Sequence, residues 1–161
     1  MTLALDTVWQ VLAGVPDPEL PAISITELGI VREVNIHDDV VRVTVTPTYG
    51  GCPATDVIRE DIHTALMAAG AREVEISITL VPAWSTDWLS EDTKAKLKRH
   101  GIAPPGTLAP GVKPLTFHPR IRCPRCDSTR TEELSAFGAT ACKALHRCLA
   151  CLEPFEYFKP I

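Results

Sequence analysis

The chain has 161 residues, a formal net charge of −4 and 45% hydrophobic residues. This composition excludes a disordered protein, and no apolar run approaches the ~18 residues of a membrane span. The mild acidity disfavours electrostatic binding of nucleic acid, and the N-terminus lacks the basic start of a secretory signal. We therefore expect a cytoplasmic protein, in which six cysteines favour metal binding or reactivity over disulfides.

Apolar side chains near the N-terminus have the spacing of one helical face. They are Leu5, Val8, Trp9 and Leu12. Three prolines between residues 16 and 21 then predict a stiff loop that carries Asp17 and Glu19. Alternating apolar residues at 34–36 and 41–45, with a polar turn between them, predict a hairpin.

A second helix is expected to begin at Pro53, because proline suits the first helical position. Its buried stripe is Ile58, Ile62, Leu66 and Ala69. Strict alternation of apolar residues over 74–80 predicts a third strand, and Ser90 is placed to cap a third helix that runs from acidic to basic residues. The order α-β-β-α-β-α predicts an α+β fold, a small mixed sheet with helices on one face.

Prolines and glycines dominate the segment 102–119 and predict a linker without regular structure. We therefore expect an α+β domain at 1–101, the linker at 102–119 and a separate cysteine-rich module at 120–161. The segment 154–158 is expected to be the last strand of this module.

The strongest motif is a pair of C-x2-C sequences separated by 21 residues. The cysteines are Cys123, Cys126, Cys148 and Cys151. Each tight turn presents two thiolates, and two such turns close a tetrahedral site. Four free thiols or disulfides are the weaker alternative. Zinc is favoured over iron, with one structural ion per chain, and it would supply much of the folding energy of so small a module.

Two further residues near the second motif could take part in this site. His146 could replace a cysteine ligand, which we consider the weaker option, and Cys142 is either a core thiol or part of a functional face. The module carries seven Lys/Arg and five Asp/Glu, and four thiolates with one Zn²⁺ bring its charge to about zero. This disfavours nucleic acid and favours a structural or protein-docking role.

Cys52 precedes Pro53 and is expected to cap the second helix, where the helix dipole favours the thiolate. From this position alone, a structural cysteine is an equally good interpretation. Asp17 and Glu19, as loop acids, are by default solvated carboxylates. No histidine lies near Cys52 in the sequence, so a thiol enzyme is disfavoured.

Together these segments resemble a known family. Residues 16–31 and 48–53 are similar to the iron–sulfur cluster assembly domain family. With 84–90, 101–105 and the C-terminal ribbon, the chain resembles PaaD-like proteins, for which the segments 84–90 and 137–143 are the more specific signals. These are accessory proteins encoded with the phenylacetyl-CoA ring epoxidase of bacterial aerobic phenylacetate degradation.

This resemblance implies a compact α+β domain in which Asp17, Glu19 and Cys52 form the candidate site for a cluster or partner. It implies a non-catalytic factor that helps to mature iron-containing epoxidase components, above all the [2Fe-2S] reductase subunit. A transient iron–sulfur cluster would need further ligands from a homodimer or a second protein. The alternative is a non-catalytic structural or regulatory subunit of the oxygenase complex, and neither role involves a membrane.

Overall fold

A computed structural model describes residues 3–106 and 120–161. The chain forms two compact units, an N-terminal unit, Met1–Leu89, and a C-terminal unit, Ser90–Ile161. Within the described ranges, no helix is both long enough and apolar enough to cross a bilayer.

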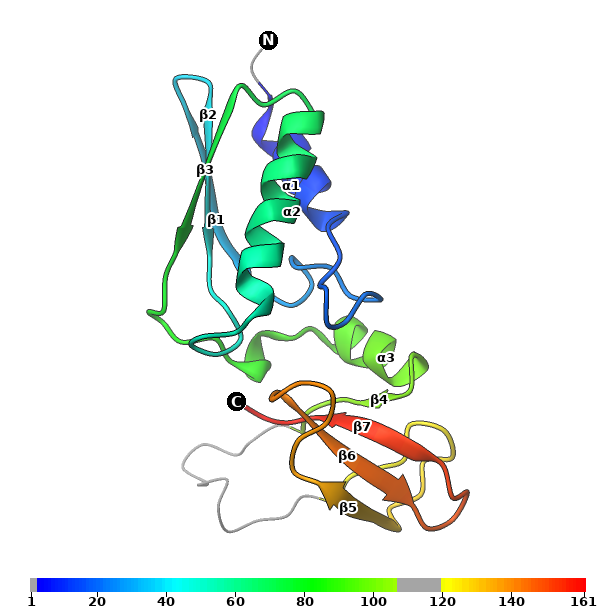
Figure 1. The fold of residues 1–161 in the computed structure, drawn as a ribbon. Helices are drawn as coiled ribbons and strands as arrows, with labels where there is room; N and C mark the ends of the chain where they lie inside the picture. Colours follow the sequence, from blue (N-terminus) through cyan, green and yellow to red (C-terminus); the bar gives the residue numbers. More distant parts are fainter. Residues whose placement is uncertain (1–2, 107–119) are drawn as a thin grey trace. The chain divides into compact units, whose positions relative to one another are not determined.

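The N-terminal unit is a three-stranded sheet with two helices on one face (Figure 1). The sequence predicted this small mixed sheet with helices on one face, but with a third helix in the same domain. Its elements are α1 (Leu5–Ala13), β1 (Val31–His37), β2 (Val40–Val45), α2 (Ala54–Ala68) and β3 (Glu73–Ile78). The strand order is β1-β2-β3, with β1 antiparallel and β3 parallel to β2. The α2 crossover therefore returns the chain to the end of the sheet at which β2 begins, so β2 and β3 both finish at the opposite end.

The apolar core of this unit lies between the sheet and the two helices. Side chains that are fully buried there include Val8, Leu12, Val43, Ile62 and Leu66. The opposite face of the sheet is polar, with an Arg42–Glu75 ion pair of 2.7 Å across β2 and β3. The hairpin turn has positive φ at Asp38 (50°) and Asp39 (64°), the geometry of a two-residue turn between twisted strands.

Three details of the N-terminal unit differ from the sequence expectation. The buried face of α1 is narrower, since Leu5 and Trp9 are 46% and 36% exposed. The strand β3 ends at Ile78, so Leu80 lies beyond it. The helix α2 begins at Ala54 with Pro53 as its N-cap, which places Cys52 one residue before the cap.

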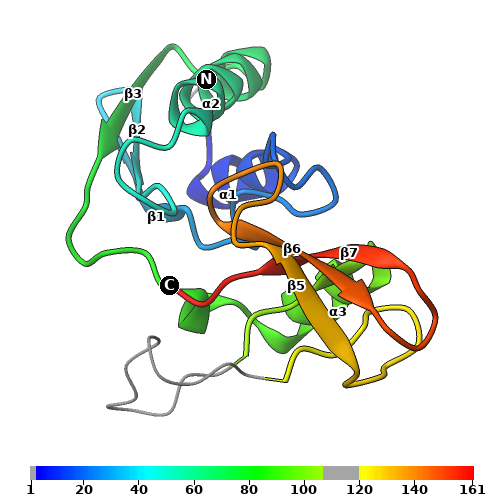
Figure 2. The same cartoon turned by 60° about the horizontal axis from the view of Figure 1, so that its bottom comes forward.

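The C-terminal unit contains one helix and a four-stranded sheet. Its elements are α3 (Glu91–Arg99), β4 (Ile102–Ala103), β5 (Thr131–Ser135), β6 (Lys143–Cys148) and β7 (Pro154–Phe158), in the sheet order β4-β7-β6-β5. Figure 2 shows β5, β6 and β7 side by side. Ser90 caps α3 by accepting a hydrogen bond from the Thr93 N–H, and β7 has the predicted bounds.

The boundary between the units differs from the one expected after residue 101. The helix α3 belongs to the C-terminal unit, because the chain passes from Gly101 directly into β4. The strand β4 pairs in parallel with β7 through Ile102–Glu156 and Ala103–Tyr157, so the expected linker begins with regular structure. Residues 107–119 of that linker lie outside the described residues.

Candidate metal centre and the Cys52 loop

The four cysteines of the two C-x2-C motifs converge in the C-terminal unit. Their sulfur atoms all lie within 4.8 Å of one another. The Sγ atoms of Cys123 and Cys151 are 3.7 Å apart, and those of Cys126 and Cys148 are 3.5 Å apart. A tetrahedral ion with Zn–S bonds of ~2.3 Å requires sulfur atoms ~3.8 Å apart, so the donor set fits a tetrahedral thiolate-bound metal such as zinc.

The backbone of the second motif donates hydrogen bonds to the sulfur of its first cysteine. The N–H groups of Ala150 and Cys151 donate to the Cys148 sulfur, both at 3.4 Å. The largest effect on the pKa of the Cys148 thiol comes from the hydrogen bond of the Cys151 N–H, which lowers it. Burial opposes this effect and the hydrogen bond of the Ala150 N–H adds to it, so the pKa is lowered to about 6. The residues that follow each motif, Asp127 and Leu152, both have a positive φ, 62° and 65°.

The two spare candidates near the site are not part of the sulfur cluster. Cys142 is buried, and its sulfur lies 3.0 Å from the Thr140 hydroxyl. His146 is also buried, stacked on Phe155 with ring centroids 5.7 Å apart and edge-on to Tyr157. Neither ring nitrogen of His146 has a hydrogen-bond partner among the described residues. Burial lowers the pKa of His146, against a smaller opposing effect of Glu133.

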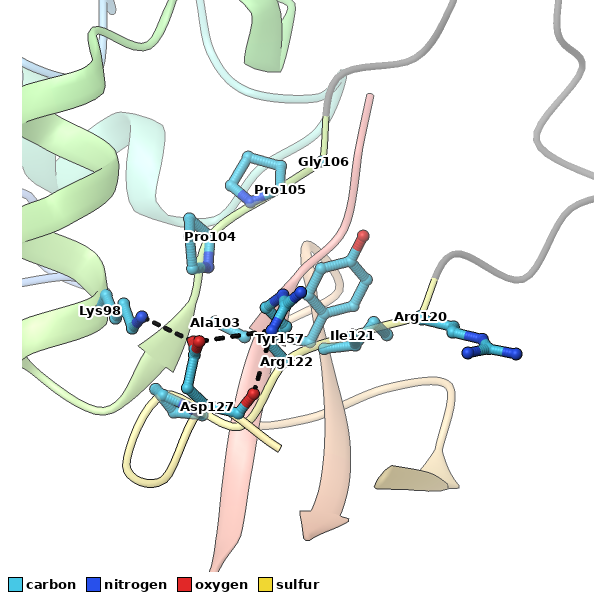
Figure 3. A pocket seen from close by; sticks show the side chains of 11 residues that line it. Lys98, Ala103, Pro104, Pro105, Gly106, Arg120, Ile121, Arg122, Asp127 and Tyr157 are labelled. Carbon is cyan, nitrogen blue, oxygen red and sulfur yellow. Dashed lines mark hydrogen bonds and ion pairs between the residues drawn. The ribbon is translucent and has the colours of Figure 1, made fainter. Parts of the chain in front are cut away.

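A cavity of about 270 Å³ lies next to the first C-x2-C motif, and three of its side chains form a small ionic network (Figure 3). Lys98 of α3 donates to the Asp127 carboxylate at 2.9 Å, and Arg122 donates to the same side chain at 3.3 Å. The hydrogen bond from Lys98 is the main reason why the pKa of Asp127 is lowered. This network ties α3 to the metal-site turn within the C-terminal unit.

Cys52 lies in the N-terminal unit, in the loop between β2 and α2. It is 8% exposed, and its carbonyl accepts a hydrogen bond from Thr55 in the first turn of the helix. The loop starts at Thr46, which is buried and whose hydroxyl has no hydrogen-bond partner among the described residues. Sequence reasoning missed Thr46; the only signal was a threonine directly after the alternating valines of β2.

Asp17 and Glu19 lie in the loop between α1 and β1, at the same end of the sheet as Cys52. The registers Val31–Val45 and Val45–Ile78 place the start of β1 beside the ends of β2 and β3. Asp17 is not a solvated acid: it is 5% exposed, and its Oδ1 accepts the N–H groups of Glu19 (2.9 Å) and Leu20 (2.8 Å).

Glu19 is half-buried. The described residues form one cluster of metal-capable side chains, the four cysteines of the C-terminal unit, so Asp17, Glu19 and Cys52 do not form a chelating set by themselves.

The tryptophan segment, residues 84–90, holds the loop between α1 and β1 in place. The Trp84 indole N–H donates to the Leu28 carbonyl at 2.8 Å, and Trp84 is buried. Trp88 lies beneath the Arg32 guanidinium, 3.8 Å from the ring centroid. Gly29 has a φ of +72° and lies against Trp88, so a larger residue there would be strained. The segment therefore has a structural role in shaping the loop.

Comparison with known proteins gives both parts of the chain a counterpart. Residues 5–78 match the family described as iron–sulfur cluster assembly protein, and residues 108–159 match the PaaD zinc beta ribbon domain. A protein of Escherichia coli that is named as a putative subunit of 1,2-phenylacetyl-CoA epoxidase is 44% identical over 154 residues, 96% of this chain and 92% of that protein.

Other relatives match only part of the chain. An Fe-S protein maturation auxiliary factor of Porphyromonas gingivalis is 36% identical over 55% of this chain and 85% of that protein. A solved domain of unknown function, DUF59, from Bacillus anthracis has a TM-score of 0.53 and 29% identity, covering 57% of this chain and 89% of that chain. A conserved hypothetical protein from Thermotoga maritima is similar, with a TM-score of 0.52 and 28% identity over 60% of this chain and 95% of that chain.

Proposed function

The chain belongs to the PaaD family, in which an iron–sulfur cluster assembly domain is joined to a zinc ribbon, and from this premise we propose that it is a non-catalytic maturation factor. Its client would be the phenylacetyl-CoA epoxidase system, specifically the [2Fe-2S] reductase component. The observation that carries the proposal is that cysteine chemistry is divided between the units: four sulfur atoms converge in one, and Cys52 stands alone in the other.

In this proposal the ribbon cysteines have a structural role. Cys123, Cys126, Cys148 and Cys151 would hold one Zn²⁺ per chain, since four thiolates close the tetrahedron and leave no open position for a substrate. Two of them, Cys123 and Cys148, belong to the buried core cluster of the unit. The ion would therefore supply folding energy to a module that has few other buried side chains.

Cys52 would be the transient ligand for an iron–sulfur cluster that is cargo rather than a resident cofactor. A single cysteine cannot hold a cluster, so the client or a second copy of the chain must supply the remaining ligands. Asp17 would act as a positioning residue, because its carboxylate is engaged with the backbone of its own loop. Glu19 remains the acid of this loop that is proposed to contact cluster or partner.

The test compares Cys52→Ala with Cys142→Ala after anaerobic purification. Cys142 is a matched control, since it is buried like Cys52 and lies outside the four-sulfur cluster. We expect about one zinc in the wild type and in both variants. Iron and labile sulfide, and the loading of the apo reductase component, should be lost only in Cys52→Ala. A Cys52→Ala protein that loads the reductase as well as the wild type does would refute the proposal.

A second candidate is suggested by the name of the E. coli relative, which describes that protein as part of the epoxidase. A structural subunit would stay bound to the finished epoxidase, whereas a maturation factor would leave it once the cluster is in place. Size-exclusion chromatography of the chain with the fully loaded and the apo reductase component separates the two. We expect co-elution with the apo form alone.

A further inference from the structure

We propose that the client docks at the edge of the N-terminal sheet, as an extended basic segment that pairs with β3 and covers Ile78, Leu80 and Val81. This inference rests on the proposed function and names the surface and the kind of partner that it requires. These three residues are called the β3 patch.

The first observation is an unpaired strand edge. In the order β1-β2-β3, β3 is the last strand, so no described strand of this sheet pairs with its outer edge. Such an edge presents free N–H and C=O groups and is a template for a strand from another chain. Among the described elements of the unit, α1 and α2 lie on one face of the sheet and add no strand to this edge (Figure 1).

The second observation is apolar exposure that rises along the chain at the end of this strand. Ile78 is 45% exposed, Leu80 is 58% exposed and Val81 is 83% exposed. The hydroxyl of Thr79 bonds both the N–H and the C=O of Val81, which fixes the turn that presents these side chains. Three exposed apolar residues of this size within four consecutive positions are typical of an interaction surface.

The patch lies at the end of the sheet that carries Cys52. Ile78 pairs with Val45, and the Thr79 N–H donates to the Val45 carbonyl at 2.9 Å. Val45 is the last residue of β2, and the loop that follows it contains Cys52. A segment bound along β3 would therefore bring its own protein to the loop where a cluster would be passed on.

The charge of the unit identifies the partner as basic. The N-terminal unit contains 13 acidic and four basic residues, a difference of −9, whereas the C-terminal unit contains seven acidic and 12 basic residues, a difference of +5. All four basic residues are arginines with local partners: Arg32 on Trp88, Arg42 with Glu75, Arg59 with Asp56, and Arg72 with Asp39. Two copies of this unit would repel each other, so a second N-terminal unit is disfavoured as the occupant.

The experiment measures binding of the purified apo [2Fe-2S] reductase component to the full chain. We expect Leu80→Gln and Val81→Gln each to weaken binding about tenfold. Met67→Gln is the matched control, because Met67 is 41% exposed in the same unit. It lies near the C-terminal end of α2, whereas the Cys52 loop precedes the N-terminal end. This variant should bind as the wild type does.

Two further readouts test the strand and its charge. Hydrogen exchange of the complex should show new protection of backbone amides over 73–81. Glu73→Gln, on the strand, should weaken binding at low salt and flatten its salt dependence more than Glu60→Gln, on the exposed side of α2.

The outcomes separate this inference from the proposed function. If the wild type loads the reductase and Val81→Gln binds it equally well, without protection of β3, docking at this edge is refuted while the function stands. If the wild type neither binds nor loads the reductase, both are refuted. If Cys52→Ala binds normally but does not load, docking and transfer are distinct steps, as we expect. Self-association through the patch, seen by light scattering and lost in Val81→Gln, would replace the client with a second copy and overturn the inference.

Discussion

Asp17 shows how a loop acid can have a structural role. Its carboxylate is buried and accepts two backbone N–H groups of its own loop. Asp17→Ala leaves both donors without this acceptor, and we expect the free energy of unfolding to fall by about 1–3 kcal/mol. Asp17→Asn, which keeps one carbonyl oxygen, should recover part of the loss. Urea denaturation measures both, with Glu60→Ala on the exposed face of α2 as the control. Equal stability of Asp17→Ala and the wild type would contradict this role.

Leu152 has a backbone conformation that its side chain disfavours. It follows Cys151 with a φ of 65°, and its side chain is 69% exposed, so little packing compensates for the strain. Leu152→Gly should raise the free energy of unfolding of the zinc-loaded protein by about 0.5–1 kcal/mol. Leu134→Gly, which removes an exposed leucine from the strand β5, should lower it. A lower melting temperature for Leu152→Gly would show that Leu152 makes a contact that outweighs the strain.

At the scale of elements, β6 carries a buried imidazole between two aromatic rings of β7. His146→Phe keeps the ring stacking and removes two buried nitrogens that make no hydrogen bond within the described ranges, so we expect a more stable C-terminal unit. Burial lowers the native pKa of His146 below its ordinary 6.5, so the unfolded chain binds this proton first. The wild type should therefore lose stability relative to His146→Phe as the pH falls below about 6.5. Thermal melts from pH 7.5 to 5.5 test this, and a difference that does not change with pH would contradict it.

The sequence predicted most elements and their order, because each carries a local signal. The hairpin turn, the Ser90 cap and the alternation in β2 are readable within a few residues. The strand β4 was missed because prolines follow it directly, and prolines usually indicate irregular structure. Proline does restrict its own position, but it leaves the residue before it in an extended conformation, which is compatible with a strand. What makes Ile102 and Ala103 a strand is β7, more than 50 residues later, which no local pattern reveals.

The candidate sites likewise contain features that the sequence could predict and features that it could not. The four cysteines could be predicted as a set, because each pair is linked by a short turn whose geometry is local. The burial of Asp17 and the position of Trp84 against Leu28 could not, since both depend on a loop folded back between distant elements. The assignment of α3 to the C-terminal unit depends on contacts such as Lys98–Asp127, which join residues 29 positions apart.

The described parts of the two units have cores of different composition. The N-terminal core is built from aliphatic side chains of α1, α2 and the sheet, with Leu12, Ile62 and Leu66 fully buried. The C-terminal core cluster includes Cys123 and Cys148 among its buried members. Without an ion, the four thiolates of this unit would repel one another or protonate, and part of the core would be lost.

Removal of the metal should therefore unfold one unit and spare the other. After treatment with a chelator under reducing conditions, we expect backbone amides of β5, β6 and β7 to lose hydrogen-exchange protection, while those of β1, β2 and α2 keep it. Cys148→Ser should behave like the chelated wild type, and Cys142→Ala should keep both its zinc and its protection. Loss of protection in both units at once would mean that the N-terminal core depends on the metal. Retention in both would mean that the strands of the C-terminal sheet, joined by pairs such as Ala144–Tyr157, suffice to hold the ribbon without an ion.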